Sequence, residues 1–60
     1  SYWSALLEFN SKIYPYSHIN VSIPSKCITM IDGRAYLSEK QMKAALRISI
    51  EAEKEGFEFA

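Results

Sequence analysis

The predicted fold depends most on one stretch of sequence, ITMIDGRAYL at residues 28–37. Asp32-Gly33 lies at its centre, and this dipeptide suits a two-residue type I′ turn, in which both central residues have positive φ. The residues on either side alternate between two faces and include the β-branched and aromatic side chains that strands favour. The stretch therefore predicts a β-hairpin, with Ile28 opposite Leu37 on the face toward the core.

A helix is predicted directly after this hairpin, at residues 39–55. Ser38 followed three residues later by Gln41 forms a capping box, in which each side chain bonds to a backbone N–H group that the first helical turn leaves unpaired. Gly56 supplies the left-handed residue that commonly ends a helix, so that Phe57 folds back onto the last turn.

Two further elements are predicted before the hairpin. Apolar residues at helical spacing from Trp3 to Ile13 predict a first helix, which ends before Pro15 because proline disfavours the α conformation in the preceding residue. The segment INVSI at residues 19–23 alternates apolar and polar side chains and predicts a third strand. The predicted fold is thus a single small α+β domain over residues 1–60, in the order α-β-β-β-α, with an antiparallel sheet.

Size and composition limit the class of protein. Apolar residues make up 48% of the chain and charged residues 23%, which excludes a disordered polymer. A chain of this length buries only about 60% of the surface that it exposes when unfolded, so its stability is marginal. One cysteine and one histidine exclude an internal disulfide and a structural zinc site, which leaves association with another chain as a source of stability.

The chain begins at Ser1 rather than at a methionine, which leaves open that it is a piece of a longer protein. No apolar run approaches the roughly 18 residues of a membrane span, so no membrane partner is expected.

The predicted C-terminal helix has a wide apolar surface. Its apolar and small side chains cover an arc of roughly 200° at about 100° per residue, about twice what docking on one surface requires. Either the first helix covers the second flank, or a partner chain covers it. Aromatic side chains in loops favour a partner. The candidate protein-binding residues are Trp3, Tyr14, Tyr16, Ile48, Ile50, Phe57 and Phe59.

The same helix carries cations on its opposite side, within about 60° of one another. A basic ridge of this kind is what contact with a phosphate backbone requires, although an ordinary solvated face has the same composition. The ridge lacks the Asn, Gln or Arg run expected of base readout. With one residue from the predicted hairpin, the candidate nucleic-acid-binding residues are Arg34, Lys40, Lys43, Arg47 and Lys54.

Charge is also divided along the chain. Residues 1–50 carry six basic and three acidic side chains, whereas residues 51–60 carry one basic and four acidic, so the neutral total hides a basic body and an acidic tail. Glu51, Glu53 and Glu55 fall in the last turns of the helix, where the macrodipole disfavours anions. The acidic tail is therefore expected to meet a basic surface, on a partner or on its own ridge.

Catalytic chemistry has little support. His18 and Cys27 are the only imidazole and the only thiol, and no third residue is placed to orient them. The two glycines are explained by a turn and a helix cap rather than by a phosphate loop. No enzyme activity, cofactor, metal or small-molecule ligand is expected. The unpaired thiol favours an intracellular location, and the compartment stays open.

The predicted order of elements is similar to that of double-stranded-RNA-binding domains, and Lys40 and Lys43 fall where those domains contact phosphate. The Gly-Pro-x-His loop of those domains is absent, and Glu39-Lys40-Gln41 replaces their lysine cluster. Three strands followed by a helix are also similar to small integrase arm-binding domains, again without a shared motif, so no family is assigned. The sequence predicts a non-enzymatic protein-interaction or dimerisation module, a regulatory or adaptor subunit, and as the alternative a small nucleic-acid-binding module.

Overall fold

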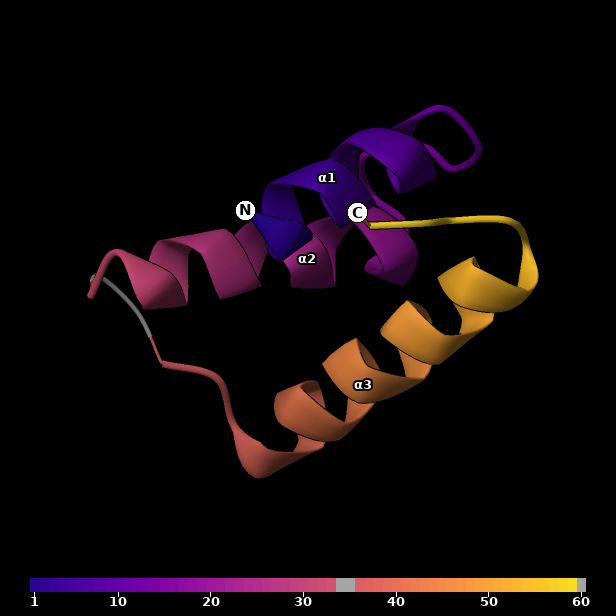
Figure 1. The fold of residues 1–60 in the computed structure, drawn as a ribbon. Coiled ribbons are helices and arrows are strands. Elements are labelled where there is room, and N and C mark those ends of the chain that lie inside the picture. Colours follow the sequence, from indigo (N-terminus) through magenta and orange to yellow (C-terminus); the bar gives the residue numbers. More distant parts are fainter. Residues whose placement is uncertain (34–35, 60) are drawn as a thin grey trace.

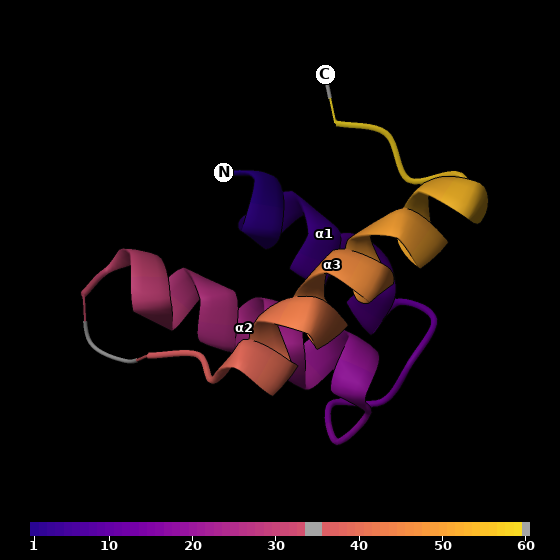
Figure 2. The ribbon, with the colours of Figure 1, turned by 90° about the horizontal axis from the view of Figure 1, so that it is seen from below.

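A computed structural model describes residues 1–33 and 36–59, and these residues form three helices and no strand. Helix α1 spans Tyr2–Ser11, α2 spans Ile19–Ile31 and α3 spans Glu39–Lys54. The largest contact between helices joins α1 and α2, and α3 crosses both of them (Figures 1 and 2). The domain is therefore all-α, and the predicted α+β fold with an antiparallel sheet is wrong.

The error lies in the middle of the chain, where α2 replaces the predicted strand at 19–23 and the first strand of the hairpin at 28–37. Asp32 ends α2 with φ −74°, and of the two residues of the expected turn only Gly33 takes a positive φ, +77°. Asp32-Gly33 therefore forms the C-terminal end of a helix and not the turn of a hairpin. A glycine with positive φ is typical of both structures, so the dipeptide alone does not distinguish them. Arg34 and Ala35 lie outside the described residues, and residues 36–37 lead into α3 without forming a strand. The resemblance in element order to double-stranded-RNA-binding domains and to integrase arm-binding domains is lost with the strands.

Tertiary packing explains why α2 is a helix. Its β-branched residues favour a strand locally, but the buried positions recur at intervals of three and four residues. They are Asn20, Val21, Ile23, Pro24 and Cys27. This spacing is the helical period, so the side chains that reach the core do so only if the segment coils. Burial against α1 and α3 outweighs a local preference of a few tenths of a kcal/mol per residue.

Pro24 interrupts the hydrogen-bond ladder inside α2, and α1 repairs the interruption. Proline has no N–H group, so the carbonyl of Asn20, four residues earlier, loses its helical partner. The side-chain nitrogen of Asn10 on α1, which is 1% exposed, donates to that carbonyl at 2.8 Å. The Asn20 carbonyl, which Pro24 leaves without a helical donor, and the buried Asn10 side chain therefore satisfy each other's hydrogen-bonding capacity. This hydrogen bond joins α1 to α2.

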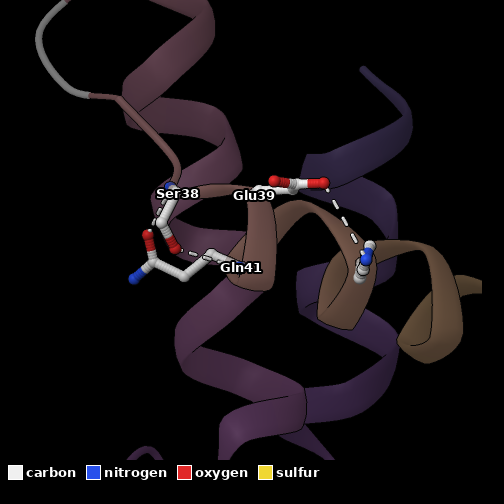
Figure 3. A network of polar contacts seen from close by, with 4 residues as sticks. Ser38, Glu39 and Gln41 are labelled. Atoms are coloured by element: carbon white, nitrogen blue, oxygen red, sulfur yellow. Dashed lines mark hydrogen bonds and ion pairs between the residues drawn. The ribbon is translucent and has the colours of Figure 1, made fainter.

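The ends of α3 agree with the sequence prediction. The Ser38 hydroxyl accepts from the Gln41 backbone at 3.1 Å, and the Gln41 side chain accepts from the Ser38 backbone at 2.9 Å, which confirms the capping box (Figure 3). At the other end Gly56 has φ +109°, and the N–H of Phe57 donates back to the carbonyl of Ala52. This is the Schellman motif, which confirms the predicted glycine cap.

The core gathers side chains from all three helices and from the tail after α3. The predicted first helix is confirmed, and it begins at Tyr2 with the Ser1 hydroxyl as its cap. Phe57 is buried and packs edge-on against Tyr2 and beside Phe9, so the tail returns over α1 (Figure 1). The buried cluster is Leu6, Ile23, Cys27, Leu37, Ala45, Ile48, Ala52 and Phe57.

Candidate interaction surface

Helix α3 presents a second apolar row that the described residues leave about half exposed. Its core face is formed by Ala45, Ile48 and Ala52. On the neighbouring flank, Met42, Leu46 and Ile50 are 53%, 63% and 46% exposed, at a spacing of four residues. We call these three residues the α3 stripe. Helix α1 therefore does not cover the second flank of α3, although the sequence had left that outcome open.

Leu46 stands between two shallow grooves. A groove of about 240 Å³ lies between α3 and the first two helices, with Trp3, Met30 and Leu37 among its lining residues. A second groove of about 340 Å³ follows the outer side of α3, between Leu46-Ile50 and the cations Lys43 and Arg47. The accessible lining of both grooves is mainly apolar.

Four of the seven predicted protein-binding residues lie in the core, in the α3 stripe or beside it. Ile48 and Phe57 are 1% and 6% exposed and belong to the core. Ile50 lies in the α3 stripe, and Trp3 is half-buried in the groove beside it. Met42 and Leu46 were not selected from the sequence, although their spacing of four residues to Ile50 on the wide arc was the signal that could have found them.

The remaining aromatic candidates lie elsewhere. Tyr14 stacks on His18 with ring centroids 4.4 Å apart and donates to a Glu55 carboxylate oxygen at 3.3 Å. Tyr16 is 80% exposed in the turn between α1 and α2. Phe59 is half-exposed and packs edge-on against Tyr2. None of the three lines either groove beside Leu46.

The predicted basic ridge is exposed on the outer side of α3, at Lys40, Lys43, Arg47 and Lys54. Lys43 lies 3.9 Å from the Glu39 carboxylate (Figure 3), a solvent-exposed pair that adds little to stability. Tertiary structure adds one feature that the sequence did not predict. Lys40, Lys43 and Arg47 border a groove of about 700 Å³ against the first turns of α2. Arg34 lies outside the described residues.

The chain's thiol and imidazole are placed for structure. Cys27 is 1% exposed, and burial raises the pKa of its thiol, which favours the unreactive protonated form. The Nδ1 atom of His18 accepts from the backbone N–H of Asn20 at 3.0 Å and caps α2. His18 and Cys27 thus belong to one helix and lie about 13 Å apart along its axis.

The described residues hold neither a cluster of metal-ligating side chains nor a membrane-spanning helix. Within residues 1–33 and 36–59 no three His, Cys, Asp or Glu side chains are grouped to hold a metal ion. None of the helices formed by these residues has the length and apolar character to span a membrane.

The described residues thus define a small three-helix domain whose most unusual feature is an uncovered apolar row beside a basic ridge. No family model, curated protein or solved structure matches this chain.

Proposed function

We propose that this chain is a non-enzymatic protein-interaction module that binds its partner through the α3 stripe. The observation that carries the proposal is the exposure of Met42, Leu46 and Ile50 in one row, flanked by grooves on both sides. Isolated apolar residues on a surface are ordinary, whereas a continuous apolar row rimmed by charges is typical of an interface. The cations beside the row, Lys43 and Arg47, provide the polar rim.

The size of the chain supports the same function. A domain of 60 residues has little core, and the described part of this one gains no support from a disulfide or a clustered metal site. Covering the α3 stripe would remove apolar area from water and stabilise the fold through linked association. A regulatory or adaptor subunit with a small core and an exposed apolar stripe is most stable when its partner covers the stripe.

Site-specific photo-crosslinking tests the proposal. A photoreactive phenylalanine analogue at position 46, in the cells that make the protein, is expected to give a covalent adduct of discrete mass. The same analogue at Ile13 is the matched control, because Ile13 is also apolar and half-exposed but lies outside the stripe and both grooves. Equal labelling from both positions, or no adduct from position 46, would contradict the proposal.

A nucleic-acid-binding module is the second candidate, favoured by the basic ridge and by the groove that Lys40, Lys43 and Arg47 border. Phosphate contacts release counterions, so binding to random RNA or DNA is expected to weaken steeply between 50 and 200 mM salt. The double charge reversal Lys43→Glu with Arg47→Glu is expected to abolish this binding, whereas Lys26→Glu on the exposed side of α2 leaves it nearly unchanged. Affinity that does not depend on salt would exclude this second function.

A further inference from the structure

We infer that the partner on the α3 stripe is a second copy of this chain, packed antiparallel across a two-fold axis that passes near Leu46. This inference rests on the proposed interaction function and names its occupant. In such a pair Leu46 meets its own copy, and Met42 of one chain meets Ile50 of the other, because the two lie four residues on either side of Leu46. The row is therefore complementary to itself.

The groove on the outer side of α3 has the position that this packing needs. The stripe is a ridge of residues spaced by four, and the next such ridge is formed by Lys43, Arg47 and Glu51. The groove of about 340 Å³ lies between these two ridges. In the commonest packing of two helices, a ridge of this spacing on each helix enters the corresponding groove of the other. The aliphatic stems of Lys43 and Arg47 would then cover the edge of the partner's apolar row while their charges stay in water.

The charges along α3 select the antiparallel orientation. Residues 39–47 carry three cations and one carboxylate, a net charge of +2, and residues 48–58 carry four carboxylates and one cation, a net charge of −3. In a parallel pair the two net-basic halves and the two net-acidic halves would face each other. An antiparallel pair sets net-basic against net-acidic halves, with one like-charged pair, Glu39 opposite Glu53, in a register centred on Leu46. The residues concerned are Glu39, Lys40, Lys43, Arg47, Glu51, Glu53, Lys54, Glu55 and Glu58.

The same charge order is unfavourable in a single helix, which is the second reason for a pair. Anions are favoured near a helix N-terminus and cations near its C-terminus. Glu39 in the first turn and Lys54 in the last turn suit this dipole, but Lys40 and Lys43 near the start of α3 and Glu51, Glu53 and Glu55 near its end oppose it. An antiparallel copy offsets this unfavourable interaction with the dipole in both helices, because it brings the acidic end of one helix to the basic start of the other. A second copy carries the complementary order of charges by virtue of its sequence, whereas a partner of unrelated sequence would need its own acidic and basic segments in the matching order.

Mass measurement and engineered cysteines test the inference on the full chain. Light scattering after size-exclusion chromatography is expected to give a mass that rises from 6.9 kDa toward twice that value between about 10 and 500 μM. Leu46→Gln is expected to raise the dissociation constant at least about tenfold, whereas Ile13→Gln leaves it unchanged. Circular dichroism of both variants shows whether the monomer remains folded.

Disulfide trapping then reports the orientation. In a Cys27→Ala background, Leu46→Cys is expected to oxidise readily to a dimer. A mixture of Met42→Cys and Ile50→Cys chains, one carrying a tag of different mass, is expected to form mixed 42–50 disulfides in preference to 42–42 or 50–50. Dominant 42–42 and 50–50 products would overturn the antiparallel arrangement.

The outcomes separate this inference from the proposed function. A chain that stays at 6.9 kDa up to 500 μM, while position 46 crosslinks to a different protein, would overturn the second copy and leave the interaction module standing. A monomer that also gives no crosslink from position 46 would contradict both. A dimer whose stability Leu46→Gln does not change would show that the copies meet elsewhere, which also overturns the inference.

Discussion

Ile48→Ala is expected to lower the free energy of unfolding by about 3 kcal/mol, and Ile50→Ala by less than about 1 kcal/mol. Ile48 is 1% exposed among side chains of all three helices, so its truncation removes buried methylene groups and leaves a cavity. Ile50 lies two residues along the same helix and is 46% exposed, so its truncation leaves no cavity. The two changes are chemically identical, and only their positions relative to the core differ.

Chemical denaturation measures both free energies. A domain of this length has a total stability of about 3–9 kcal/mol, so Ile48→Ala is expected to remove a third or more of it and to shift the denaturation midpoint accordingly. The measurement is made in a Leu46→Gln background, so that association does not add to the apparent stability of Ile50. Similar losses for the two variants would show that α3 is not oriented as described.

Asn10→Leu is expected to destabilise the domain by about 2 kcal/mol, and the loss is expected to depend on Pro24. Leucine has the branched shape of asparagine, with two somewhat larger methyl groups in place of the amide oxygen and nitrogen, so the change leaves no cavity and removes the donor for the buried Asn20 carbonyl. In Pro24→Ala the alanine N–H restores the helical bond to this carbonyl, so the side-chain donor is no longer required. In that background Asn10→Leu is expected to cost about 1 kcal/mol less.

A double-mutant cycle measures this coupling directly. The unfolding free energies of the parent, the two single variants and the double variant are expected to give an interaction term of about 1 kcal/mol. Asn10→Ala extends the cycle, because it removes volume as well as the donor and is expected to cost more than Asn10→Leu. A coupling near zero would mean that the Asn20 carbonyl finds another donor when Asn10 is replaced.

The part of the fold that was predicted correctly depends on interactions between residues close in sequence. The Ser38–Gln41 capping box and the Gly56 cap join residues no more than five positions apart, and both were correctly identified. The wide apolar arc of α3 was also apparent, because helical periodicity follows from spacing alone. For the candidate surface, the sequence therefore supplied the helix, the ridge of cations and the excess of apolar side chains.

The segment at residues 19–31 could not be assigned in this way. Its β-branched residues and its Asp32-Gly33 end satisfy the local rules for strands and a hairpin, and the same residues satisfy the rules for a helix with a glycine cap. Pro24 added to the ambiguity, because an interior proline argues against a helix unless a donor from elsewhere meets the freed carbonyl. That donor is Asn10, and no local pattern connects it to Asn20.

The chain's local sequence by itself determined where α3 begins and ends, which of its residues are cationic and that its apolar surface is too wide for one contact. Tertiary structure decided that residues 19–31 are helical, that Ile48 is buried, and that Met42, Leu46 and Ile50 are the residues left uncovered. The physical reason is that caps and periodicity are set by neighbours along the chain. Burial depends on which distant side chains arrive, and here α1 and α2 cover only one flank of α3.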